Sequence, residues 1–240
     1  QGAFLNFRVV GTDETAAKDT VGPEIRALFL NDTTFVEGGQ VNPTPLFAVR
    51  LWDQSGVNVS GSSIGHDIML TIDNQTSRSY NLNSYYQMLT GTDGEGIVQY
   101  AIPELTEGLH TAEFKVWDVQ NNSTTVRFTF EVVKGLKPEL IDLYATPNPA
   151  RNQVEFRLDH NRPETPMQVR IFVYDLAGRR VWWTEESGSS ELFKSYVVTW
   201  NLTNQGGSRL RPGVYLYRGS IRTSYSQEVT KANKLIILAQ

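Results

Sequence analysis

The sequence of 240 residues contains no cysteine, and this absence removes several classes of chemistry. Without cysteine the chain forms no disulfide framework and no thiolate metal site, and it supplies no cysteine nucleophile. Histidine is scarce, with three residues, and none of them shows the paired spacing that zinc sites use. No apolar run approaches the ~20 residues that a membrane-spanning helix requires.

The sequence does not open with a basic segment followed by an apolar core, which is the pattern of a secretory signal peptide. The chain begins Gln1-Gly2-Ala3-Phe4. If the protein is exported, we therefore expect this sequence to be a fragment whose N-terminal part has been removed.

The formal net charge of -4 hides an asymmetry between the two halves. Residues 1–135 carry 8 Lys and Arg against 16 Asp and Glu, whereas residues 136–240 carry 14 against 10. Because acidic residues are interspersed throughout the basic half, we expect no binding to nucleic acid. Two interpretations stay open: two solvated domains of different origin, or a basic half that docks on an acidic partner.

Alternation of apolar and polar residues, the pattern of half-buried strands, dominates the chain. It is clear at residues 47–51, 68–72, 126–132 and 154–158, and clusters of Gly, Asn, Asp and Pro separate such runs. Only residues 83–89 have weak helical character. The pattern predicts an all-β protein of two antiparallel Ig-like β-sandwich domains in tandem.

The domain boundary is expected at residues 133–138, where Gly135 and Pro138 interrupt a strand pattern. We expect residues 1–20 to be the tail of a preceding domain and a linker, residues 21–135 to form an Ig-like β-sandwich, and residues 136–240 to form a second β-sandwich.

Two neighbouring strands of the second half are apolar on both faces. Residues 169–173 place Val, Ile and Val on one face, whereas Phe172 and Tyr174 occupy the other. Trp182 and Trp183 likewise point to opposite faces. We expect the first of these strands to be covered on both sides, and at least one indole to be exposed or covered by a partner.

An ordered set of motifs runs through the second half. Its members are Asn148 and Pro149, then Tyr174, Asp175, Gly178 and Arg179, then Pro212, Gly213 and Tyr215, and finally Lys234. Taken singly, each is a turn or strand signal that any β-sandwich uses. In their order and spacing, they resemble the C-terminal sorting domain of proteins exported by the type IX secretion system of Bacteroidetes.

In that family the domain is a folded signal, which the export machinery recognises and which a surface peptidase removes from most cargo. The resemblance implies that residues 136–240 are a sorting domain and that the protein is exported to the cell surface and associated with the outer membrane. It implies two partners, the type IX secretion machinery and an outer-membrane β-barrel of the PorV type.

A second series of motifs lies in the first half, and includes Asp19-Thr20-Val21-Gly22-Pro23, Ile64-Gly65-His66-Asp67 and Lys115-Val116-Trp117-Asp118. It resembles the Ig-like segment beside the sorting domain in the gingipain-like C-terminal signal peptidases of type IX secretion, which are cysteine peptidases. The resemblance implies a non-catalytic C-terminal region whose catalytic Cys and His lie upstream, so we assign no catalytic residue here.

The three histidines are interpreted as structural residues. His66 lies in a turn, His110 opens a strand and His160 sits in a polar loop. Calcium needs six to eight oxygen ligands, and the carboxylates of Asp93 and Glu95, with Asp73-Asn74 on another loop, are too sparse for it. We therefore expect no metal site and no cofactor.

Six side chains of the second half form a predicted interface: Trp182, Trp183, Arg209, Arg211, Tyr217 and Arg218. Mixed Arg, Trp and Tyr are typical of interaction hot spots, although a solvated sheet face has the same composition. An alternative function also stays open, in which the chain is an adhesin or a carbohydrate-binding module of another exported protein and binds glycan through Trp52 or Trp117.

Overall fold

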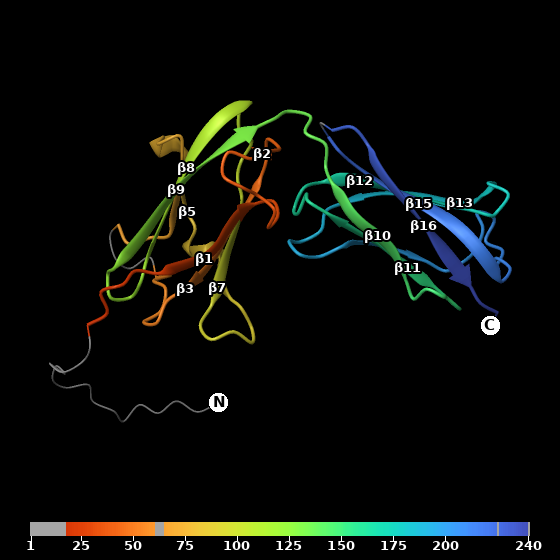
Figure 1. The fold of residues 1–240 in the computed structure, drawn as a ribbon, viewed down its shortest axis with the longest axis horizontal. Coiled ribbons are helices and arrows are strands. Elements are labelled where there is room, and N and C mark those ends of the chain that lie inside the picture. Colours follow the sequence, from red (N-terminus) through yellow and green to blue (C-terminus); the bar gives the residue numbers. More distant parts are fainter. Residues whose placement is uncertain (1–17, 61–64, 225, 240) are drawn as a thin grey trace, which may run out of the picture.

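The computed structural model describes residues 18–60, 65–224 and 226–239. Residues 1–17 of the expected N-terminal tail lie outside the described part of the chain. The described residues form two β-sandwich domains that lie side by side along the long axis of the molecule (Figure 1). The predicted all-β, Ig-like architecture is confirmed.

The first domain consists of two facing sheets, and only the short strand β2 runs parallel to its neighbour, β9. One sheet has the order β1-β3-β7-β6 and the other the order β2-β9-β8-β4-β5. The strands are β1 (Glu24–Leu30), β2 (Gln40–Val41), β3 (Leu46–Trp52), β4 (Met69–Ile72), β5 (Ser79–Asn81), β6 (Tyr86–Met88), β7 (Gly96–Ala101), β8 (Gly108–Trp117) and β9 (Ser123–Val132).

The second domain also has two sheets, both antiparallel. A sheet of order β10-β11-β14 faces a sheet of order β13-β12-β15-β16. The strands are β10 (Leu140–Thr146), β11 (Val154–His160), β12 (Met167–Tyr174), β13 (Arg180–Gly188), β14 (Tyr196–Trp200), β15 (Gly213–Thr223) and β16 (Val229–Ile237).

The alternating residues identified in the sequence fill the two cores. In β9, Phe128, Phe130 and Val132 point into the first core, together with Phe47 of β3 and Phe114 of β8. In the second domain, the inward residues of β11 and β12 meet those of β15 and β16. Burial of these aromatic and aliphatic side chains is the main source of stability for a sandwich of this size.

Helical structure is limited, in the described residues, to two 3₁₀ turns, η1 (Thr76–Arg78) and η2 (Asn83–Tyr85). The weak helical pattern at residues 83–89 thus forms one turn and then strand β6. Across the described chain, no helix has the length and hydropathy needed to span a membrane.

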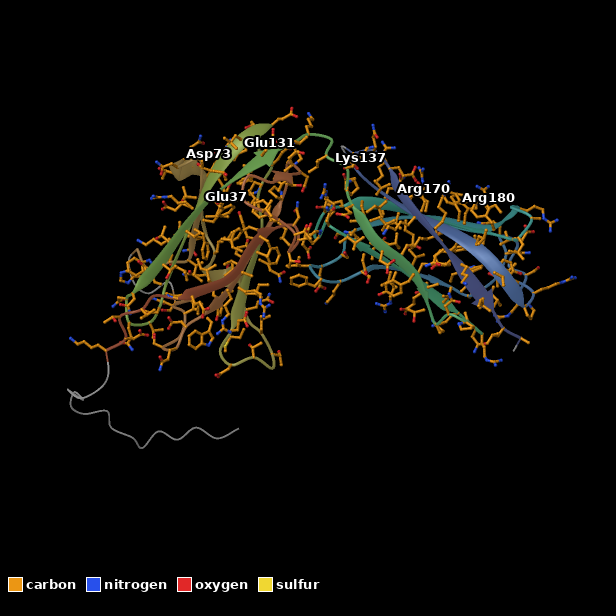
Figure 2. The ribbon with its side chains drawn as sticks, in the orientation of Figure 1. Glu37, Asp73, Glu131, Lys137, Arg170 and Arg180 are labelled. Carbon is orange, nitrogen blue, oxygen red and sulfur yellow. The ribbon has the colours of Figure 1, made fainter. Side chains whose placement is uncertain are left out.

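The connection between the domains runs from the end of β9 at Val132 to the start of β10 at Leu140, and includes Lys137 (Figure 2). A buried arginine, Arg162, holds this connection: its guanidinium donates hydrogen bonds to the carbonyls of Leu136 (3.4 Å) and Lys137 (2.9 Å). Burial lowers the pKa of Arg162 to about 10.

The loop between β13 and β14 reaches the first domain. Leu192 is buried against Phe29, Leu46 and Ile97, and the ring of Phe193 lies 5.9 Å from that of Phe29. The two domains therefore share a small apolar contact in addition to the connecting segment.

Candidate functional site

The sorting motifs of the second domain come together at one end of its sandwich. β12 ends there at Tyr174, β15 begins at Gly213 and β16 ends at Ile237. Strand pairing places Tyr174 beside Leu216, and Leu216 beside Lys234. Segments that are far apart in the sequence thus form one continuous surface.

The turn between β12 and β13 is organised by the carboxylate of Asp175. Its Oδ1 accepts the backbone N–H groups of Ala177 and Arg179, both at 3.0 Å, and its Oδ2 accepts Nε of Arg179 at 2.8 Å. These hydrogen bonds, led by that from the Arg179 backbone, hold the pKa of Asp175 below its ordinary value. Gly178 has a φ of 78°, a conformation that favours glycine.

Asn148 connects the start of the domain to its last strand. Its side-chain Nδ2 donates to the carbonyl of Lys234 (2.9 Å), and its Oδ1 accepts the N–H of Ile236 (3.0 Å). Next to it, Ala150 exchanges backbone hydrogen bonds with Ile236 and Leu238, both at 2.8 Å. The Asn-Pro motif therefore acts as a short extra strand along the edge of β16.

Pro212 and Gly213 lead into β15, where Tyr215 closes the same end of the core. The Tyr215 hydroxyl donates to the carbonyl of Arg211 at 2.9 Å. Burial raises the pKa of Tyr215, and the negative charge of Asp175 adds to this effect. The two turns of the motif are therefore close enough to interact electrostatically.

The predicted interface residues divide between the core and the surface. Tyr217 is 1% exposed, and burial raises its pKa to about 12. Trp182 packs on the core, with its ring 4.8 Å from Trp200 and 6.2 Å from Phe156. The prediction that Tyr217 and Trp182 belong to a contact surface is corrected, because the pleat turns both side chains inward.

The other predicted interface residues lie at the surface, and two of them share a face. Trp183 and Arg218 are exposed on the outer side of the sheet that contains β12. Arg209 donates to the carbonyls of Arg151 and Asn201 and so fastens a loop. Arg211 is exposed beside Tyr215.

All three histidines have structural partners. His110 is 5% exposed, with Nδ1 2.8 Å from Oδ2 of Asp73 and Nε2 2.7 Å from the carbonyl of Thr106. Burial opposes ionisation of Asp73, but its hydrogen bonds to His110 and Thr111, with the charges of His110 and Arg78, lower its pKa overall. No sequence signal identifies this pair, because Asp73 lies in the turn after β4 and His110 lies on β8, far along the chain.

His160 forms hydrogen bonds, whereas His66 makes an aromatic contact. His160 Nδ1 accepts the N–H of Arg162 (3.1 Å), and its Nε2 lies 2.9 Å from Oγ of Ser190. Burial, opposed in part by Asp159, lowers the pKa of His160 to about 4. The ring of His66 stacks on Trp117 with 4.3 Å between centroids.

Two of the carboxylates considered in the sequence, Glu95 and Asp73, form ion pairs. Glu95 is 5% exposed and lies 2.7 Å from Nε of Arg50, and Asp73 lies 2.9 Å from Nη1 of Arg78. A different group of carboxylates comes together instead, from Asp19, Asp53 and Asp118, with oxygens within 4.8 Å of one another. These three residues could hold a cation, although Asp53 and Asp118 also accept backbone N–H groups of their own turns.

No family model matches this chain. No curated protein matches it either. Among solved structures, dimeric latent PorU from Porphyromonas gingivalis is 39% identical, with a TM-score of 0.53 over 92% of this chain. The match covers 21% of that protein, so this chain spans about a fifth of PorU.

Two other solved structures are less similar. PorZ, a surface component of the type IX secretion system of Porphyromonas gingivalis, is 15% identical, with a TM-score of 0.29 over 89% of this chain and 30% of that chain. The N-terminal Ig1-2 module of the Drosophila receptor protein tyrosine phosphatase DLAR is 11% identical, with a TM-score of 0.31 over 91% of this chain and 98% of that chain. Neither similarity indicates a function for this chain.

Proposed function

Since the chain is similar to a C-terminal part of PorU, we propose that it is the non-catalytic C-terminal region of a cell-surface cysteine peptidase of the type IX secretion system. The absence of cysteine agrees with this assignment, because this chain supplies no cysteine nucleophile. The whole protein acts as a C-terminal signal peptidase, with its catalytic residues upstream of this region.

The second domain is the export signal and the docking module. The supporting observation is that the motifs around Asn148, Asp175, Tyr215 and Lys234 meet at one end of the sandwich. These motifs form a joint surface only after folding, which suits a signal that is read in its folded form. The docking partner is an outer-membrane β-barrel of the PorV type, and the first domain is an adaptor.

Glycan binding by the first domain has weaker support. Arg26 stacks on Trp52 with 4.9 Å to the ring centroid, and the Trp52 indole donates to the carbonyl of Asp93 at 2.8 Å. Lys115 and His66 lie against Trp117, at 4.4 Å and 4.3 Å. A sugar platform requires an open aromatic face, and these contacts occupy faces of both indoles.

An export assay tests the proposal. A fluorescent reporter with a secretory signal peptide at its N-terminus would carry this chain at its C-terminus in Porphyromonas gingivalis, and antibody labelling of intact cells would detect it. We expect surface labelling in wild-type cells and periplasmic retention in a strain without a functional type IX secretion system. Equal labelling in the two strains would contradict the export role.

A binding assay tests the docking role separately. The full chain would be immobilised and exposed to a purified PorV-type barrel in detergent. Saturable binding is expected, and its absence while a glycan array gives a signal would favour the carbohydrate-binding alternative.

A further inference from the structure

The outer face of the sheet β13-β12-β15-β16 has no strand packed over it in the described part of the chain. Phe172 and Tyr174 of β12 point to this side, next to Trp183 of β13 and Leu216 of β15. Trp183 is 38% exposed and Leu216 48% exposed. Large apolar side chains gathered on an open sheet face mark a surface that a partner covers.

Two arginines lie over the aromatic rings of this face. The rings of Phe172 and Trp183 are stacked, with 6.4 Å between centroids and 17° between planes. The guanidinium of Arg218 lies 5.1 Å from the Phe172 ring, and that of Arg180 lies 5.9 Å from Phe172 and 5.6 Å from Trp183. A cation–π contact restrains a guanidinium while its N–H groups remain able to donate to an acceptor.

The arginines of this face are not all neutralised by its acidic residues. Its acidic residues Glu185 and Glu228 are both engaged with Arg170, at 2.7 Å and 3.7 Å. Arg180 and Arg218 have no ion pair among the described residues. Arg170 and Arg180 project from the same side of the second domain (Figure 2).

We propose that this aromatic–arginine face, defined by Phe172, Trp183, Arg180, Leu216 and Arg218, docks a protein surface that presents Asp or Glu side chains around an apolar centre. The N–H edges of Arg180 and Arg218 receive the carboxylates, and the partner's apolar side chains cover Trp183 and Leu216. Two ordered guanidinium groups match planar carboxylates in a bidentate geometry, which gives the contact its direction.

This inference rests on the proposed function, because it takes the acidic surface to be an extracellular loop of the outer-membrane barrel. It adds which side of the second domain makes the contact and which chemistry the barrel presents. It adjoins the motif end of the sandwich, where Tyr174 and Leu216 lie beside Lys234. At that end Asp175 and Asn148 are already hydrogen bonded within the chain.

The test uses the full chain and the purified PorV-type barrel in detergent, with affinity measured by biolayer interferometry. The double variant Arg180→Glu/Arg218→Glu is compared with the unsubstituted chain. We expect the dissociation constant to rise at least about tenfold in the variant, and to rise with salt in the unsubstituted chain. Arg218→Lys keeps the charge and loses the planar guanidinium with its paired donors, so we expect an intermediate loss.

Arg127→Glu is the matched control, because Arg127 is an exposed arginine on a strand of the first domain. Its affinity should stay within about twofold of the unsubstituted chain, since rim charges distant from a contact matter little. Circular dichroism and thermal unfolding should be unchanged in the double variant, since both arginines are exposed.

The outcomes separate the two proposals. Binding by the unsubstituted chain that the double variant retains overturns this face as the docking surface and leaves the docking role in place. Absence of binding by the unsubstituted chain overturns both. Concentration-dependent self-association of the chain that the double variant abolishes would also overturn the inference, because a second copy would then cover the face.

Discussion

The side chain of Asn148 is hydrogen bonded to the backbone of Lys234, with 2.9 Å between Nδ2 of Asn148 and the carbonyl oxygen of Lys234. A second bond, from the N–H of Ile236 to Oδ1 of Asn148, makes the amide equivalent to a backbone unit of a neighbouring strand. The first and last motifs of the second domain are thereby joined.

Replacement of Asn148 by alanine removes both bonds and leaves two backbone groups of β16 without these partners. We expect the free energy of unfolding to fall by about 1–3 kcal/mol, measured by urea denaturation. Asn148→Asp retains the acceptor for Ile236 but sets a carboxylate oxygen against the carbonyl of Lys234, so it should also destabilise the protein. Equal stability of all three proteins would contradict the role of this bridge.

Replacement of Gly178 tests the turn that holds Asp175. A Cβ at this position would have no atom within 4 Å, so the cost of Gly178→Ala comes from its φ of 78° alone. We expect about 1 kcal/mol of destabilisation. Gly206→Ala is the control: its φ does not lie in the left-handed region, and the nearest atom to its Cβ is Oδ1 of Asn204 at 3.4 Å. A larger loss for the control would show that the turn is not strained as described.

Arg162→Met should destabilise the protein and loosen the connection between the domains. The variant removes the buried guanidinium that donates to the half-buried carbonyl of Leu136 and the exposed segment at Lys137, which we expect to cost about 1–3 kcal/mol. Chemical denaturation gives the energy, and limited proteolysis should show faster cleavage at residues 133–139.

The matched control for Arg162 is Arg157→Met. Arg157 pairs with Glu155 at 2.7 Å in a half-exposed position, so its loss should cost less than about 1 kcal/mol. Similar losses for the two variants would contradict a special role for the buried guanidinium.

Stability should fall as the pH decreases from about 6.5 to about 4, because His160 is held neutral in the folded protein. Its folded pKa of about 4 lies below the ordinary value of 6.5, so the unfolded chain binds the proton first. The stabilisation linked to neutral His160 is fully present above the pKa of the unfolded state and is lost as the pH falls through this window. It is on the order of 3 kcal/mol or less. Urea midpoints at three pH values measure it.

His160→Gln serves as the comparison for the pH series. The amide has no titration in this window, so the variant should show a flatter dependence between pH 6.5 and 4. The carboxyl groups of Asp73 and Asp175, whose pKa values are lowered, titrate below this pH range in both proteins. They therefore do not contribute to a difference between the two pH series. Parallel curves for the two proteins would exclude His160 as the source.

The local pattern of the sequence was sufficient for the strands. Alternation at residues 126–132 and 154–158 predicted β9 and β11, since a strand with one buried face must alternate. It was insufficient at residues 83–89, where spacing compatible with a helix forms one 3₁₀ turn and a strand. Pairing with β7 supplies backbone partners there, and a short helix would lack them.

For the site, the sequence identified the motifs but not their geometry. The doublet Trp182-Trp183 predicted one indole on each face of a strand, and only the packing of Trp182 on Trp200 decided which one is exposed. The expectation that β12 is covered on both sides holds for the inner face alone, since nothing described in this chain packs as a strand over Phe172.

The sequence by itself determined most of the strands and the resemblance to a sorting domain, because alternation and turn residues act over a few neighbouring positions. The tertiary structure decided the contact of Asn148 with Lys234, the pair of His110 with Asp73 and the burial of Tyr217. These depend on strand order and register across segments far apart in the chain, and a shift of one residue in register would move every side chain to the opposite face.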